Sequence, residues 1–315
     1  MGSPGSETPV NLLASFALST ALFVIIPAYA SSLEAQALLK WKSSLLNQNL
    51  STSSLFSWTL PPQNATGSNA TVSSPYSWYG ISCNPARSVI GINLTNSNIR
   101  GTLNEFPFSS LPYLTYIDMY INELFGGIPP QVSLLTNLTY LDLSFNQLSG
   151  KIPREISNLM KLEVLHLLSN KLSGSIPDEI GQFRLLNELA LLARLYIYNN
   201  SFSGPIPLEI GNLTNLEEIY MDTNFLMGPI PPTFGKLTKL TQLHVYDNEL
   251  SGSIPPELGN LKLLRQLALH YNNLTSSIPS TSGNLTELTL LYLYGNMLSG
   301  NIPDDLGNLR AMINL

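Results

Sequence analysis

The sequence is poor in the residues on which many enzymes and metal proteins depend. Its 315 residues include one cysteine and three histidines, and only 11% of them are charged. A single cysteine excludes an intramolecular disulfide and any multi-cysteine metal site. The net charge of −6 argues against nucleic acid and anionic lipid as partners. Because phosphate-loop, kinase and His-Glu-x-x-His motifs are also missing, we expect no catalytic residue, metal or cofactor.

Long apolar runs are absent too, apart from residues 12–26. Pro27-Ala28-Tyr29-Ala30 follows this run and is similar to an A-x-A cleavage site, so residues 1–30 are predicted to be a secretory signal peptide. The segment before the run has no Lys or Arg, which leaves an uncleaved membrane anchor as the alternative. No later stretch is long enough to span a bilayer. A secreted chain also fits the nine candidate glycosylation sequons: Asn49, Asn64, Asn69, Asn93, Asn137, Asn199, Asn212, Asn273 and Asn284.

The chain does contain an internal repeat. Apolar residues stand eight, five and three positions before each member of a series of asparagines, and the steps between members are 24, 24, 30, 24, 24, 24 and 24 residues. One repeat cannot bury its own apolar residues, so stacked coils must share a continuous core. The pattern predicts an α/β solenoid with a parallel concave β-sheet, a convex side of 3-10 and irregular structure, and an asparagine ladder: Asn122, Asn146, Asn170, Asn200, Asn224, Asn248, Asn272 and Asn296.

The 30-residue step contains two overlapping strand motifs, beginning at Leu186 and Leu192. Both cannot form strands, because no residues would remain to pass round the outside of the coil. We expect residues 192–197 to form the strand, residues 181–191 to form an enlarged helical outer turn, and the stack to be locally defective there.

The segment before the repeats predicts a cap. Apolar residues at helical spacing (Leu38, Trp41, Leu45) indicate an amphipathic helix, and the Ser-, Thr- and Pro-rich residues 46–75 indicate a loop. The predicted organisation is a signal peptide at 1–30, an N-terminal cap at 31–88 and about nine coils at 89–315. The coils are expected to be irregular at 181–200, and the last one is expected to be truncated.

The repeat unit and the cap residues are similar to those of a known family. The unit L-x-x-L-x-L-x-x-N-x-L-S-G-x-I-P is similar to the plant-type leucine-rich repeat, and residues 33–45 with Trp78-x-Gly80-x-x-Cys83 resemble the N-terminal cap of plant leucine-rich-repeat receptor-like kinases. The family usually has a second cysteine where Tyr76 stands, so the cap disulfide is expected to be absent. Cys83 is then either an inert buried thiol or a partner for another chain.

The resemblance implies a leucine-rich-repeat superhelix outside the cell that binds a secreted peptide or protein on its concave face, often with a leucine-rich-repeat co-receptor. Full-length members continue into one membrane span and a Ser/Thr kinase, and they signal in defence or development at the cell surface. Two alternatives stay open: a secreted inhibitor similar to polygalacturonase-inhibiting proteins, and a non-functional truncated remnant.

Positions −4 and −2 from each ladder asparagine should point out of the concave sheet, because side chains alternate along a strand. These sixteen positions hold all three histidines and seven of the fourteen tyrosines. Rigid aromatic area with polar tips suits protein or peptide recognition, although stacking between neighbouring strands would also favour it. The candidate ligand-binding residues are Tyr120, His166, Tyr196, Tyr198, Tyr220, Asp222, His244, Tyr246, His270, Tyr292 and Tyr294.

Overall fold

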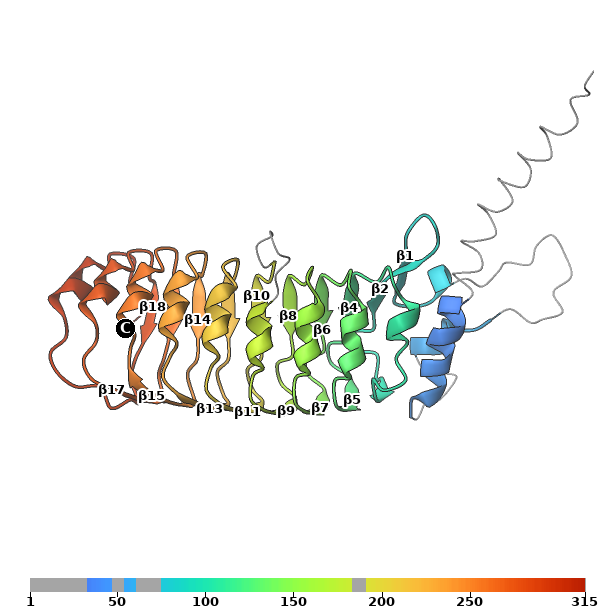
Figure 1. The fold of residues 1–315 in the computed structure, drawn as a ribbon, viewed down its shortest axis with the longest axis horizontal. Coiled ribbons are helices and arrows are strands. Elements are labelled where there is room, and N and C mark those ends of the chain that lie inside the picture. The colour runs from blue at the N-terminus through green and yellow to red at the C-terminus, as the bar shows by residue number, and fades with distance from the viewer. Residues whose placement is uncertain (1–32, 47–53, 61–74, 183–190, 315) are drawn as a thin grey trace, which may run out of the picture.

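A computed structural model describes residues 33–46, 54–60, 75–182 and 191–314. Within these ranges the chain forms coils stacked side by side along one axis, with the N-terminal cap at one end of the stack (Figure 1). The expected signal peptide and the sequons at Asn49, Asn64 and Asn69 lie outside the described residues. No helix in the described part of the chain is long and apolar enough to cross a membrane.

One ten-stranded sheet runs the length of the described stack. Each coil adds one short strand, and every pair is parallel except β1 with β2. The apolar positions are aligned from coil to coil, as where Leu165, Leu195 and Ile219 stand opposite one another. The strands are β1 (Ile81–Cys83), β2 (Val89–Asn93), β4 (Tyr116–Asp118), β6 (Tyr140–Asp142), β8 (Val164–His166), β10 (Arg194–Tyr196), β12 (Glu218–Tyr220), β14 (Gln242–His244), β16 (Gln266–Ala268) and β18 (Leu290–Tyr292).

A second parallel sheet, of eight strands, follows the ladder asparagines and was not predicted from the sequence. The sequence predicted only a glycine-permitted bend there. The residues up to and including that glycine instead pair with the neighbouring coil, as Ser149 does with Lys171 and Gly150 with Leu172. The strands are β3 (Arg100–Gly101), β5 (Glu123–Gly126), β7 (Gln147–Gly150), β9 (Lys171–Gly174), β11 (Ser201–Gly204), β13 (Phe225–Gly228), β15 (Glu249–Ser253) and β17 (Asn273–Thr275).

Short 3-10 helices form the opposite side of the stack. In most coils the helix begins directly after the proline of the Ile-Pro pair, because proline fixes an extended φ and has no N–H to leave unpaired. The helices of the coils are η3 (Phe108–Ser110), η4 (Pro130–Leu134), η5 (Arg154–Asn158), η6 (Asp178–Gln182), η7 (Leu208–Asn212), η8 (Pro232–Lys236), η9 (Pro256–Asn260), η10 (Ser280–Asn284) and η11 (Asp304–Asn308), and the cap contains η1 (Ser54–Ser57) and η2 (Pro75–Ser77).

The asparagine ladder lies between the two sheets. The side-chain oxygen of Asn146 accepts the N–H of Leu124 at 2.9 Å, and its amide nitrogen donates to the carbonyls of Met119 at 2.9 Å and Leu143 at 3.1 Å. The side chain thus pairs backbone groups of two successive coils, which the turn would otherwise leave unsatisfied. The same set of bonds recurs at Asn170, Asn200, Asn224, Asn248, Asn272 and Asn296.

The expected defect at the 30-residue step does not occur in the described residues. Strand β10 lies within the predicted segment 192–197, and it pairs in register with both β8 and β12. Asn200 keeps its ladder bonds, to Leu172 at 3.0 Å and Leu167 at 3.0 Å. The residues that make this step longer than 24 stand between η6 and β10 in the sequence. Neither sheet therefore contains an inserted residue at this step. The predicted helical outer turn falls mainly on residues 183–190, which are outside the described part.

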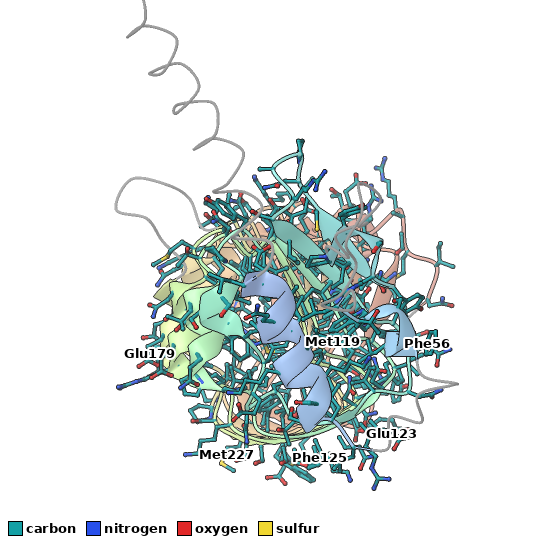
Figure 2. All side chains as sticks on the ribbon, turned by 90° about the vertical axis from the view of Figure 1, so that its right-hand side faces the viewer. Phe56, Met119, Glu123, Phe125, Glu179 and Met227 are labelled. Atoms are coloured by element: carbon teal, nitrogen blue, oxygen red, sulfur yellow. The ribbon has the colours of Figure 1, made fainter. Side chains whose placement is uncertain are left out.

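The cap closes the N-terminal end of the core. A helix over residues 33–44 covers the first coil, as the end-on view of Figure 2 shows, with Met119 inside the stack behind it. Its Leu38 and Trp41 are fully buried, and the Trp41 indole donates to the Thr102 carbonyl at 3.0 Å. The segment expected to be a loop contains η1 and the buried Trp58, which stacks on Trp78 at 5.4 Å.

Cys83 is a free, half-buried thiol at the end of β1. Burial, with the nearby Glu34 carboxylate, raises its pKa to about 11. Because the thiolate is the reactive form, this environment keeps the sulfur unreactive at neutral pH.

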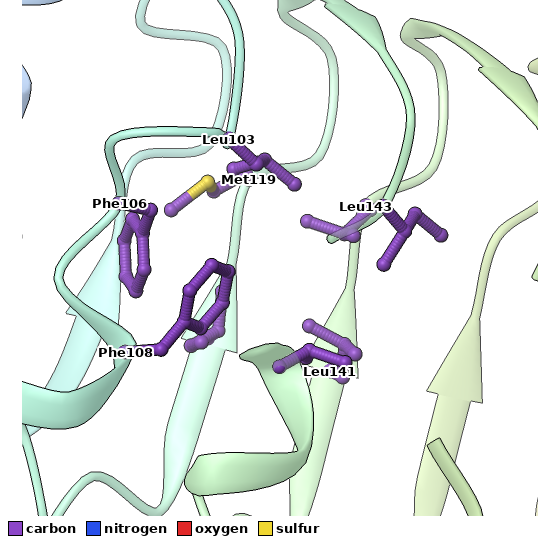
Figure 3. A pocket seen from close by; sticks show the side chains of 9 residues that line it. Leu103, Phe106, Phe108, Met119, Leu141 and Leu143 are labelled. Atoms are coloured by element: carbon purple, nitrogen blue, oxygen red, sulfur yellow. The ribbon is translucent and has the colours of Figure 1, made fainter. Parts of the chain in front are cut away.

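One pocket lies inside the stack, between the first coils (Figure 3). All nine lining residues are apolar, including Leu103, Phe106, Phe108 and Met119. It is a packing space of the core and presents nothing to a polar ligand.

A candidate ligand-binding face

The outward side of the ten-stranded sheet carries the candidate residues. We use the term concave face for the side chains at positions −6, −4, −2 and −1 of the eight coils with a ladder asparagine. Strands β4 to β18 place positions −6 and −4 on one side of the sheet and bury position −5 between the sheets, as with Tyr116, Ile117 and Asp118. Sequence analysis missed position −6, although continuing the alternation by one step would have found it.

Position −4 forms a stack of rings that crosses the sheet. His166 lies nearly parallel to Tyr196, with ring centroids 4.2 Å apart. Tyr196 stacks on Tyr220 at 4.6 Å, and Tyr220 on His244 at 4.5 Å. Tyr140, at position −6, contacts His166 edge-on. The lateral packing that the sequence left open as an alternative is therefore present.

The stack changes rows where position −4 is occupied by Ala268. It continues at position −2, where Tyr246 lies 4.3 Å from His270, and His270 lies 4.7 Å from Tyr294. Tyr292 contacts His270 edge-on at 5.5 Å. The candidate rings from His166 onward thus form a nearly continuous surface, whereas Tyr120 lies apart and contacts Phe145.

Hydrogen bonds fix the polar edges of these rings. The Tyr196 hydroxyl donates to Glu218, and the Tyr220 hydroxyl donates to Gln242. His244 Nε2 lies 3.0 Å from Gln266 Oε1. Each acceptor stands at position −6 of the following coil, so the missed row orients the row that was predicted.

Two buried carboxylates lie on the face. Asp142 Oδ2 is 3.1 Å from His166 Nδ1, and Asp142 Oδ1 accepts the Ser144 N–H at 2.8 Å. Burial alone would raise the pKa of Asp142, but the bonds from His166 and Ser144 outweigh it and hold that pKa below its ordinary value. Asp222 has the Tyr246 hydroxyl, and not a histidine, as its side-chain partner. Burial raises its pKa to about 6, although Tyr246 donates a hydrogen bond to it.

The three histidines are dispersed over the face. His244 and His270 occupy different rows, and burial lowers the pKa of both. In the described ranges no group of three or more His, Cys, Asp or Glu side chains is arranged to hold a metal ion.

The concave face is acidic. Its carboxylates are Asp118, Asp142, Glu218, Asp222 and Asp247, and the one Lys or Arg at these positions is Arg194. Arg194 Nε lies 3.9 Å from Glu218. The other Lys and Arg residues of the chain lie at other positions, so a cationic partner would meet few like charges here.

The described sequons differ in exposure. Asn93, Asn199, Asn273 and Asn284 are exposed, whereas Asn137 and Asn212 are half-buried. Asn93 is at the N-terminal end of the ten-stranded sheet, and Asn284 ends η10 on the opposite side. Four described candidate sites therefore present their side chains to solvent.

Comparison with known proteins agrees with this architecture. The family model described as Leucine Rich Repeat matches residues 137–159, 161–183, 191–213, 215–237, 239–261 and 287–309. The chain is 45% identical over 124 residues to MDIS1-interacting receptor like kinase 2 of Arabidopsis thaliana, a match to 39% of this chain and 11% of that protein.

Two solved ectodomains from the same plant have the same shape. The chain is similar to that of the membrane receptor kinase GASSHO1/SCHENGEN3, solved with CASPARIAN STRIP INTEGRITY FACTOR 2 (TM-score 0.78, 32% identity, 90% of this chain and 32% of that one). It is also similar to the receptor kinase HAESA, solved with the peptide hormone IDA and the co-receptor SERK1 (TM-score 0.74, 32% identity, 89% and 44%). The chain spans about a tenth of the curated relative and less than half of each solved ectodomain. The chain therefore contains leucine-rich repeats, and the relatives and solved structures to which it is similar include plant receptor kinases and their leucine-rich-repeat ectodomains.

Proposed function

We propose that this chain is the extracellular ligand-recognition domain of a plant leucine-rich-repeat receptor-like kinase, and that it binds a peptide or protein on its concave face. The observation that carries the proposal is the run of tyrosine and histidine rings from His166 to Tyr294 across successive strands. Stacking fixes the rings before a ligand arrives, so binding costs little side-chain entropy.

Lateral packing alone does not account for the whole face. Stacked rings stabilise the sheet whether or not their edges reach solvent. Tyr294, however, is 52% exposed, and Tyr271 beside it is 57% exposed. Tyr271 has a neighbouring coil on each side, so its exposure belongs to the face itself, and tyrosine is enriched among binding hot spots.

The similar ectodomains support the ligand class. GASSHO1/SCHENGEN3 was solved with an integrity factor, and HAESA was solved with a peptide hormone and a co-receptor. By analogy, the partners of this chain are a secreted peptide or protein and a leucine-rich-repeat co-receptor, met at the cell surface. The chain acts by binding, and phosphoryl transfer belongs to the kinase domain of full-length relatives.

The test is a binding screen with the chain produced in secreted form. Plant and microbial peptides are presented at pH 5.5, and affinity is measured by calorimetry for every peptide retained. Tyr294→Ala should weaken binding at least tenfold. Tyr113→Ala is the matched control, because Tyr113 is 53% exposed but lies outside the concave face.

If Tyr294→Ala and Tyr113→Ala lost the same affinity, or if neither lost any, the concave face would not be the binding site. Inhibition of a fungal polygalacturonase without peptide binding would support the inhibitor alternative instead.

A further inference from the structure

The residue before each ladder asparagine is left-handed throughout the stack. From Ile121 to Tyr271, φ at this position is between 52° and 54°, and at Gly295 it is 63°. The conformation cannot relax locally, because the same residue donates its N–H to the next coil, as Phe145 does to Leu168 at 3.0 Å. Asparagine, aspartate and glycine tolerate this region best, and bulky or β-branched residues are outliers in it.

Several coils have small or polar residues at this position, and three do not. Ser169, Asn199, Asp247 and Gly295 are of the tolerated or small kind. Ile121, Phe145 and Tyr271 are bulky, and their side chains are 41%, 43% and 57% exposed. These three side chains are strained at the backbone, and each leaves two-fifths or more of its surface exposed to water. Folding therefore gives little reason for them, and binding is the role that remains.

The three bulky residues lie in two separate places on the concave face, in the first two and in the seventh of the eight coils. The Phe145 ring stands edge-on to Tyr120 at 5.2 Å, and the Tyr271 ring stands edge-on to Tyr294 at 5.2 Å. Ile121 is in the coil next to Phe145. Each of the two places thus presents an aromatic cluster that has one solvent-exposed member at the left-handed position.

Between the two clusters the face carries acidic groups. Glu218, Asp222 and Asp247 lie there with the single cation Arg194, and Asp142 stands in the same coil as Phe145. His166 is bonded to Asp142, and His270 lies near Asp247. The charge of this middle segment favours a ligand with basic side chains at its centre.

The distance between the clusters sets a minimum ligand length. Phe145 and Tyr271 belong to the coils of β6 and β16, which are five strand steps apart. At ~4.8 Å per step this is about 24 Å, which an extended peptide at ~3.3 Å per residue covers in about seven residues.

We propose that the concave face takes an extended cationic peptide of at least about seven residues, whose apolar ends dock on Phe145 with Ile121 and on Tyr271. This inference rests on the proposed function and names its ligand class. The left-handed bulky residues are the anchors, and the acidic middle of the face selects the charge.

The first experiment separates binding from folding. Phe145→Asn and Tyr271→Asn should raise Tm by ~1–3 °C through relief of strain, and each should weaken peptide binding at least tenfold. Ser276→Gly is the matched control, because Ser276 is also left-handed (φ 67°) but lies four residues after its ladder asparagine, outside the concave face. It should raise Tm and leave affinity unchanged. A fall in Tm with unchanged affinity in the anchor variants would show that these residues are structural, and would overturn the proposal.

The second experiment tests the ligand class. Displayed nonapeptide libraries present either Lys/Arg or Asp/Glu at the centre, and either Leu/Phe or Ser at both ends. Selection on the full chain at pH 7.5, where Asp222 with its pKa of about 6 is ionised, should enrich the library with basic centres and apolar ends.

Enrichment of acidic centres, or of Ser ends to the same degree, would overturn this inference. If those peptides still lost affinity on Tyr294→Ala, the proposed function would survive. Absence of enrichment from every library would remove both.

Discussion

His166 Nδ1 lies 3.1 Å from Asp142 Oδ2 across neighbouring coils. The two side chains are 14% and 8% exposed, so the contact is formed largely out of water. Asp118, one coil earlier, has no histidine as a partner but has hydrogen bonds otherwise similar to those of Asp142. Each aspartate accepts a hydroxyl from the tyrosine two residues before it and an N–H from the residue two after it.

This similarity makes Asp118 a matched control for the histidine contact. Asp142→Asn should lower the free energy of unfolding by about 1–3 kcal/mol, since bonds to charged groups are among the stronger ones. Asp118→Asn should lower it by less. Because the pKa of Asp142 is held below its ordinary value, its contribution is present at neutral pH and is lost as pH falls through the depressed pKa. Urea unfolding at pH 3 and pH 7 measures both effects, and equal losses in the two variants would mean that His166 adds nothing.

Glu34 has the opposite pH dependence. It is 3% exposed, its Oε2 accepts the Val89 N–H at 3.1 Å, and burial raises its pKa to about 7. The folded state therefore holds the proton more tightly than the unfolded state. The resulting stability is fully present below pH ~4.5 and is lost as pH rises through about 7.

The wild-type chain should accordingly unfold at a lower temperature at pH 8 than at pH 5.5. Glu34→Gln should remove most of that difference, which corresponds to about 2 kcal/mol, because only the part of the shift between pH 5.5 and the raised pKa of about 7 is lost over this range. The control is Glu105→Gln, because Glu105 also joins the cap helix to the repeats, through Lys40, but is half exposed. A pH dependence that persists in Glu34→Gln would assign the effect elsewhere, and Asp222, with its pKa raised to about 6, is the next group to test.

Ser276 occupies a position that the other coils with a ladder asparagine fill with glycine. Its φ is 67°, whereas the equivalent Gly252 and Gly300 have φ of 77° and 82°. A side chain costs energy in this region, so Ser276→Gly should raise the free energy of unfolding by about 0.5–1 kcal/mol. Gly252→Ser should lower it by a similar amount. Thermal unfolding of the two variants checks the pair, and a loss of stability in Ser276→Gly would show that the hydroxyl has a role that outweighs the strain.

The sequence predicted those parts of the molecule that have a fixed period. Residues such as Leu138 and Leu141 show which side of each strand is buried, and one asparagine per coil marks the ladder. The second sheet has no such signal, because strands such as Gln147–Gly150 contain one buried residue each. The left-handed position before the asparagine is also hidden, since Ile121, Ser169 and Gly295 share no property of their side chains.

The candidate site was predicted in part. Positions −4 and −2 did contain the stacked rings, but their hydrogen-bond acceptors at position −6 were missed. Tyr271 and Phe145 were missed because alternation along a strand stops before the turn that holds them. A sequence pattern gives the period of a strand but not the backbone conformation that ends it.

The 30-residue step leads to the last prediction. Asn200 follows that step, yet its oxygen accepts the Leu172 N–H at 3.0 Å, and its nitrogen donates to Leu167 at 3.0 Å and Ile197 at 3.1 Å. Asn248 follows an ordinary step and makes the equivalent bonds at 2.9, 3.1 and 3.2 Å. Each alanine variant should therefore lose about 3 kcal/mol, because buried backbone groups are left without partners.

Equality of the two losses is the decisive result. If the longer step loosened the junction, the backbone around Asn200 would reach water and Asn200→Ala would cost little. The Leu172 N–H donates to the Asn200 side chain, and the Leu226 N–H donates to the Asn248 side chain. Hydrogen exchange at these two amides measures each junction directly. Similar protection of both amides in the wild-type chain would show that the stack is continuous through the step. Faster exchange at the Leu172 amide alone would support the local defect that the sequence suggested.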